Sequence, residues 1–149
     1  MNRILLLICS CLLISGLIAC KPKKDAGTTT SDKVTQSGVL VEDFEKYRDS
    51  APVNLETLDL HENTLIMQIS YSGGCEDHEF SLLGLKYTSG SNPVAREIQL
   101  YHNNNGDHCR ELLEKKLRID ISAFALKNSE PVMLKIKGWK NPVLYTLAK

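Results

Sequence analysis

The sequence predicts an all-β fold, a small two-layer sandwich of about seven strands spanning residues 39–149. Apolar and polar side chains alternate along several short runs, and a period of two is that of a strand with one buried face. Turn-forming residues separate these runs at short intervals. No run alternates with a long helical pattern, which argues against the parallel sheets of α/β folds.

The alternation is present in five runs, each with apolar residues two positions apart. Residues 112–116 fit either one helical turn or the start of a strand. The apolar residues of the five runs are Leu65, Met67, Ile69 and Tyr71; Ile98 and Leu100; Leu117, Ile119 and Ile121; Val132, Leu134 and Ile136; and Val143, Tyr145 and Leu147.

Residues that favour tight turns punctuate the same region. Short strands with turns at this spacing are typical of an immunoglobulin-like sandwich, and we expect a single domain of that type. The turn signals are Glu62-Asn63, Ser72-Gly73-Gly74, Ser89-Gly90-Ser91-Asn92-Pro93, Asn105-Gly106, Lys127-Asn128-Ser129 and Lys140-Asn141-Pro142.

The segment before the alternating runs allows two interpretations. Leu40, Phe44 and Tyr47 fall at helical spacing, which predicts a short amphipathic helix ended by Ser50-Ala51-Pro52. A strand through residues 39–41 is the competing interpretation.

The N-terminal residues have the pattern of an export signal. Met1-Asn2-Arg3 gives a positive start, and the apolar stretch 4–18 is shorter than the roughly 20 residues that span a bilayer. Leu17-Ile18-Ala19-Cys20 then resembles a lipobox, the site where lipoprotein signal peptidase cleaves before a lipidated cysteine. The resemblance implies a bacterial lipoprotein precursor, with residues 1–19 as signal peptide and with diacylglycerol and an N-acyl chain on Cys20.

Residues 20–38 are polar and have little to bury, so we expect a flexible tether between the lipid and the domain. Each buried acyl methylene contributes about 0.8 kcal/mol, and two or three chains give stable membrane attachment. Lysines rather than acidic residues follow Cys20, at Lys21, Lys23 and Lys24. We therefore expect a membrane-anchored envelope protein, at the outer membrane and facing the periplasm.

The charge balance argues against one class of partner. The chain has 18 basic and 18 acidic side chains, so it has no net field to attract nucleic acid. The expected partners are the membrane, through the lipid, and a protein of the envelope.

Cys75 and Cys109 are the two cysteines of the expected domain. Exported proteins meet oxidising conditions, so the pair is expected to form a disulfide. This bond would bring the Gly73-Gly74 and Asn103–Asn105 loops together as a binding edge.

Histidines near these cysteines support an alternative. Cys75 and His78 have Cys-x-x-His spacing, and His102 and His108 lie close to Cys109 in the sequence, so a zinc-type site using His78, His102 and His108 is the second hypothesis. Oxidised cysteines cannot be thiolate ligands, so we expect no metal cofactor. The Asn103–Asp107 stretch lacks the glycine position and the final Glu of an EF-hand and is expected to be a turn.

Catalysis has little support in the sequence. There is no G-x-S-x-G elbow, no H-E-x-x-H and no phosphate-binding glycine loop, and we expect no catalytic residues. Trp139 and Tyr101 are expected to be core or rim residues.

Three segments together resemble an uncharacterised domain of small bacterial lipoproteins. They are Ser72–Phe80, His102–Cys109 and Leu117–Ser122, with paired Gly-Gly-Cys-x-x-His and Gly-Asp-x-Cys motifs. The resemblance implies a small β-rich domain on a lipid anchor and brings no activity. We therefore expect a lipid-anchored binding or structural module, with a histidine metal site or inhibition of an envelope-directed hydrolase as the alternatives.

Overall fold

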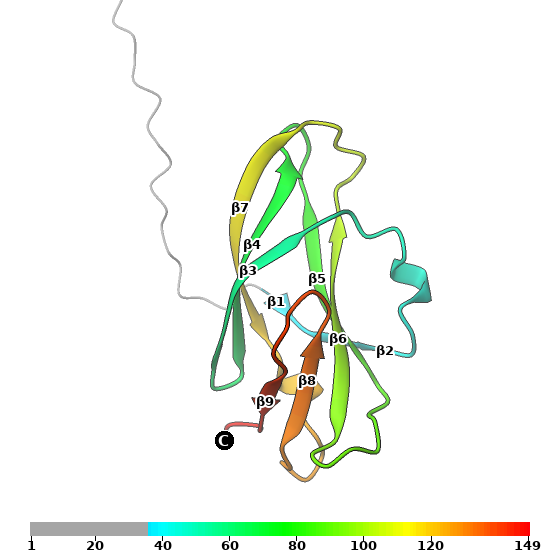
Figure 1. Cartoon of the computed structure of the whole chain (residues 1–149), viewed down its shortest axis with the longest axis vertical. Coiled ribbons are helices and arrows are strands. Elements are labelled where there is room, and N and C mark those ends of the chain that lie inside the picture. The colour runs from blue at the N-terminus through cyan, green and yellow to red at the C-terminus, as the bar shows by residue number, and fades with distance from the viewer. Residues whose placement is uncertain (1–35) are drawn as a thin grey trace, which may run out of the picture. The chain divides into compact units, whose positions relative to one another are not determined.

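The computed structural model describes residues 36–149, which form two β-sheets packed face to face (Figure 1). The expected signal peptide, Cys20 and most of the tether lie outside these residues. No helix within them has the length and apolar character needed to cross a membrane. The elements are β1 (Gln36–Ser37), β2 (Val39–Val41), η1 (Glu45–Tyr47), β3 (Asn54–His61), β4 (Thr64–Gly73), β5 (Glu79–Leu85), β6 (Ala95–Asn103), β7 (Glu111–Asp120), η2 (Ser122–Phe124), β8 (Val132–Ile136) and β9 (Val143–Tyr145).

One sheet has the order β1-β7-β4-β3 and the other has the order β2-β5-β6-β8-β9. Three neighbouring pairs, β1·β7, β2·β5 and β6·β8, are parallel, and the remaining pairs are antiparallel. The first two strands belong to different sheets, and the chain crosses between the sheets again after β2, β4, β6 and β7. The all-β sandwich predicted from the alternation is confirmed, with nine strands in the described part of the chain.

The five alternating runs lie in β4, β6, β7, β8 and β9, and most of their apolar residues are buried. Residues 112–116 belong to β7, so the strand interpretation is correct there. Residues 39–41 form β2, and only the three-residue 3-10 helix η1 follows it, so the amphipathic helix is wrong. Parallel pairing of β2 with β5 explains the difference, because the sheet satisfies backbone groups that a helix would have bonded internally.

The folded part also begins earlier than the expected tether boundary at residue 38. Gln36 and Ser37 pair with Ile119 and Asp120 of β7, and the Gly38 N–H donates to the Asp120 carbonyl at 2.7 Å. The three residues therefore belong to the sandwich.

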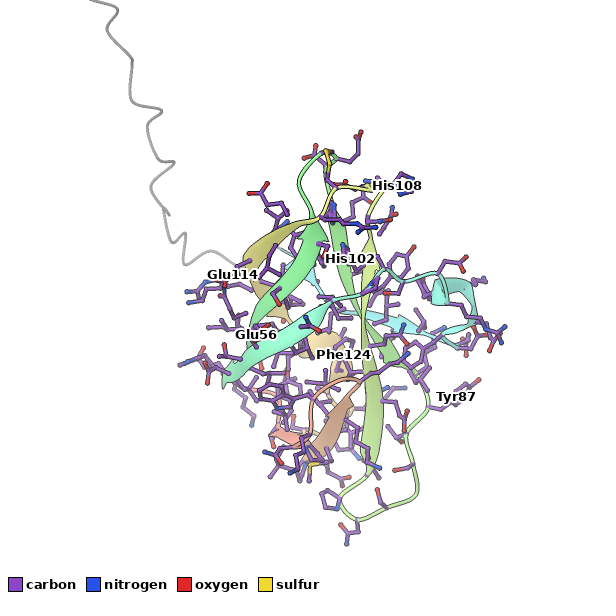
Figure 2. All side chains as sticks on the ribbon, turned by 45° about the horizontal axis from the view of Figure 1, so that its top comes forward. Glu56, Tyr87, His102, His108, Glu114 and Phe124 are labelled. Atoms are coloured by element: carbon purple, nitrogen blue, oxygen red, sulfur yellow. A yellow bond between two sulfur atoms is a disulfide. The ribbon has the colours of Figure 1, made fainter. Side chains whose placement is uncertain are left out.

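Phe124 fills the centre of the core and has no exposed surface (Figure 2). Its ring packs on the backbone at two glycines, because a Cβ would stand 2.5 Å from the ring at Gly38 and 2.8 Å from it at Gly84. Both positions therefore need a residue without a side chain where the sheets close over the ring.

Candidate functional site

Two of the inter-sheet connections, β4–β5 and β6–β7, lie at the same end of the sandwich, at the top of Figure 1. The β4–β5 connection carries Cys75 and the β6–β7 connection carries Cys109, and a disulfide joins them with their Cα atoms 5.9 Å apart. The expected pairing of these cysteines is present in the structure. Because each connection runs from one sheet to the other, the bond fastens the Gly73-Gly74 and Asn103–Asn105 loops side by side.

Asp107 forms a second link between the two connections. Its Oδ2 accepts hydrogen bonds from the backbone N–H groups of Cys75, at 2.9 Å, and Glu76, at 3.0 Å, and its Oδ1 accepts one from the Cys109 N–H at 2.7 Å. The Glu76, Cys109 and Cys75 amides together hold the pKa of the Asp107 carboxyl well below its usual range. The carboxylate is therefore ionised and bonded to both connections.

A chain of two histidine rings extends inward from this carboxylate. His78 Nε2 lies 3.0 Å from Asp107 Oδ2, His78 Nδ1 lies 2.7 Å from His102 Nε2, and His102 Nδ1 lies 3.1 Å from the Pro52 carbonyl. The side chains of His78 and Asp107 are 2% and 0% exposed, and His102 is 1% exposed as a residue. The rings are therefore closed to a substrate, and the chain joins segments of the fold.

The proton count of this chain follows from its two ends. A carboxylate and a carbonyl both accept, so three hydrogen bonds require three ring protons, whereas two neutral imidazoles carry two. Two neutral imidazoles therefore make two of these three contacts as hydrogen bonds at any one time. Burial lowers the pKa of His102, which is stacked on Phe80 with 4.6 Å between ring centroids.

The structure separates His108 from the other two histidines of the metal hypothesis. Figure 2 places His108 at the outer edge near the disulfide and His102 deeper in the molecule. Within residues 36–149, the potential ligand atoms of Cys75, Asp107 and Cys109 lie within 4.8 Å of one another. The two sulfurs of that group are bonded to each other and are not thiolate ligands.

The expected turn at Asn105-Gly106 is present. The Asp107 N–H donates to the Asn104 carbonyl at 2.8 Å, and both Asn105 and Gly106 have positive φ, at 48° and 76°. The turn is not part of a β-hairpin, because β6 and β7 belong to different sheets. It places Asp107 where its carboxylate reaches the β4–β5 connection.

A groove of about 1070 Å³ opens on the side of the sandwich that carries η1. The sequence analysis missed it, because it lies between segments distant along the chain. Trp139, expected in the core or rim, is half-buried there and was the one signal available. The lining residues are Phe44, Glu45, Arg48, Ser50, Ala51, Val53, Asn54, Leu55, residues 97–100, residues 135–140 and Pro142.

One wall of the groove is held in place by His102. The His102 N–H donates to Ser50 Oγ at 3.1 Å, and the His102 carbonyl accepts from the Ala51 N–H at 2.8 Å. The third contact is the one between the His102 ring and the Pro52 carbonyl. The histidine chain therefore runs from the disulfide-bonded end to the 50–52 wall.

The floor of the groove includes an interruption in the edge of β6. The β6·β8 ladder runs from Ala95 to Ile98, whose carbonyl accepts from the Lys137 N–H at 2.9 Å. Backbone groups two residues apart on a strand point to the same side, so the next positions on this edge are Leu100 and His102. His102 is bonded to the 50–51 segment, and Leu100 lies in the gap between the two sets of bonds.

Basic side chains surround this gap. Lys135, Lys137 and Lys140 line the groove and are exposed, and none of them is in an ion pair with the described residues. Arg48 also lines it and is paired with Glu45, which leaves Glu97 as the other acidic side chain of the lining. The groove thus has an excess of positive charge in a chain with no net charge.

No protein-family model matches the sequence, and no curated protein matches it. Solved structures do resemble it. A NigD-like immunity protein from Bacteroides caccae superimposes with a TM-score of 0.53 at 20% identity, over 76% of this chain and 59% of that one. A protein of unknown function (DUF1344) from Bacteroides vulgatus gives a TM-score of 0.52 at 12% identity, over 78% of this chain and 57% of that one.

A toxin-related protein from Parabacteroides distasonis gives a TM-score of 0.50 at 12% identity, over 76% of this chain and 60% of that one. This chain therefore spans about three fifths of the length of each of the three proteins. At such identities the likeness establishes the shared β fold alone.

Proposed function

We propose that this protein is a lipid-anchored module of the bacterial envelope that binds a protein partner in the groove beside β6. The observation that carries the proposal is the groove itself. It combines a half-buried Trp139, lysines that have no ion-pair partner among residues 36–149, and an interrupted strand edge, and each of these features suits contact with another chain. The disulfide and Asp107 fasten the far end of the sandwich and leave the groove as the open part.

The anchor in this proposal is the lipid on Cys20, and the location is the outer membrane with the domain facing the periplasm. Leu17-Ile18-Ala19-Cys20 supports it through its likeness to a lipobox. Stable attachment needs more than one acyl chain, and a diacylated and N-acylated cysteine meets that requirement. A tether would let the domain reach partners in the same compartment.

A protein is the kind of partner that the similar structures favour. One of them is described as an immunity protein and another as a toxin-related protein. A hydrolase of the envelope, inhibited by this protein, would be one such partner. A metal site at His78, His102 and His108 receives less support, because the first two rings bond to each other and His108 lies apart.

Site-directed photo-cross-linking tests the groove. A benzoyl-phenylalanine at the position of Lys140, in the groove, should give a specific adduct in living cells of the bacterium that makes the protein. The same group at the position of Lys127, which is also exposed but outside the groove, is the matched control. Equal labelling at both positions, or no adduct at position 140, would contradict a partner in the groove.

The anchor has its own test, which does not depend on the partner. Cys20→Ala should release the protein from the membrane fraction, and globomycin, which inhibits lipoprotein signal peptidase, should cause the precursor to accumulate. A Cys20→Ala chain that stays membrane-bound, in cells where globomycin has no effect, would refute lipidation.

A further inference from the structure

The groove indicates which kind of protein segment would fit it. We infer that its occupant is an extended, acidic segment of the partner, which adds to the edge of β6 at Leu100 and places carboxylates on Lys135, Lys137 and Lys140. This inference rests on the proposed function and specifies the chemistry of the partner at the same site.

The extended conformation follows from the interrupted edge. Between the Lys137–Ile98 bond and the Ser50 and Ala51 bonds to His102, the edge of β6 has a gap in its backbone bonds at Leu100, which lines the groove and is 5% exposed. A strand edge pairs with another extended chain through backbone N–H and C=O groups, and this is how β-augmentation recognises peptides. A helical segment would keep its backbone groups bonded internally and would leave this rung of the ladder unused.

The acidic character follows from the side chains on either side of that rung. Lys135 and Lys137 flank the buried Ile136 at the end of β8, so both present their ammonium groups on the exposed face. Lys140 follows on the turn that leads to β9. Because none of the three has an ion-pair partner within residues 36–149, a carboxylate from outside would not need to displace an existing bond.

Trp139 supplies both an anchor and a reporter. It is the single tryptophan of the chain and is half-buried in the groove lining. Aromatic residues of this kind contribute much of the binding energy where they sit at the centre of a polar rim. Its fluorescence therefore changes when a segment covers it, with no label on the protein.

The experiment uses the full chain, produced in a bacterium and extracted in mild detergent. An eight-residue peptide of alternating glutamate and valine is titrated while the Trp139 emission is recorded, and a peptide with glutamine in place of glutamate is the control. The glutamate peptide should bind saturably and at least about tenfold more tightly than the glutamine peptide, with affinity falling as salt is added.

Two variants decide whether the lysines are responsible. Lys135→Glu combined with Lys137→Glu should weaken binding of the glutamate peptide by about tenfold or more, because attraction becomes repulsion. Lys127→Glu reverses the charge of one exposed lysine outside the groove and should bind like the unmodified chain. The backbone bond from Lys137 to Ile98 does not involve the side chain, so circular dichroism should report an unchanged fold.

The failures of the two proposals can be told apart. If the glutamate and glutamine peptides bind equally, or if all the charge variants behave alike, the acidic segment is refuted. If the glutamate peptide leaves the emission unchanged while a partner still cross-links at position 140, the acidic segment alone is refuted. If neither peptide binding nor the cross-link is observed, the proposed function fails with it.

Discussion

Removing the Cys75–Cys109 disulfide should weaken the sandwich by a calculable amount without unfolding it. The two cysteines are separated by 34 positions in the sequence, and closing a loop of that length is worth about 4 kcal/mol of unfolding free energy in the chain-entropy model. Small domains have about 5–15 kcal/mol in total, so the reduced chain should remain folded. Asp107 supports this outcome, because its bonds to the Cys75 and Glu76 amides keep the two connections together without the sulfurs.

Urea denaturation of the detergent-extracted chain, followed by Trp139 fluorescence and circular dichroism, measures the difference. With a slope of about 1.5 kcal/mol per molar urea, the oxidised and reduced midpoints should lie roughly 2–3 M apart. The double variant Cys75→Ser/Cys109→Ser should match the reduced chain and should not respond to reductant. Midpoints that differ by less than about 0.5 M would refute the account of the disulfide as the main constraint on the unfolded chain. A reduced chain without native circular dichroism would refute the role given to Asp107.

Three further predictions concern the core and the histidine chain. Phe124→Ala should lower the unfolding free energy by about 3–5 kcal/mol, and Gly84→Ala should lower it by about 1–3 kcal/mol because its Cβ would stand 2.8 Å from the Phe124 ring. The double variant should lose less unfolding free energy than the sum of the two single losses, and an additive result in urea denaturation would contradict that contact. Because burial lowers the pKa of His102, the unfolded chain gains a proton below a pH of about 6.5 that the folded chain does not gain. The unfolding free energy should therefore fall by up to about 1.4 kcal/mol per pH unit as the pH drops from about 6.5. Equal urea midpoints at about pH 7.5 and 5.5 would exclude this effect of His102. Gly73→Ala places a Cβ 2.5 Å from the His78 ring and should lower the unfolding free energy by about 1–3 kcal/mol, whereas Gly90→Ala, where a Cβ meets nothing within 4 Å, should be neutral in the same assay.

The strands that were predicted well are those in which burial on one face imposes a period of two. In β4, for example, Leu65, Met67 and Ile69 are fully buried. The sequence analysis did not single out β3 or β5. The residues of β5 from Leu82 to Gly84 are buried in succession, so no alternation marks them. A strand buried on both faces cannot be distinguished by period from other apolar segments.

The candidate site was only half predictable, for a related reason. Cysteine usage and the expected export of the chain were enough to predict the Cys75–Cys109 pair. Asp107 looked like a turn residue, and its role depends on the β4–β5 connection lying beside it, which only the sheet order determines. The groove could not be predicted from the sequence, because its walls and floor come from three stretches of the chain, within residues 44–55, 97–100 and 135–142.

The disulfide-bonded end and the groove are physically connected, and His102 is the residue that connects them. Its ring contacts His78, which contacts Asp107, while its backbone and its second ring nitrogen bond to residues 50–52. The 50–52 wall is outside the strands and the 3-10 helices, so these bonds to a buried strand residue take the place of a ladder in positioning it. A sandwich of this size has few layers with which to shape a binding surface. In this protein the buried Asp107–His78–His102 hydrogen-bonded chain positions the wall of the groove. This role explains why a buried histidine pair occupies a position that an apolar pair would otherwise fill.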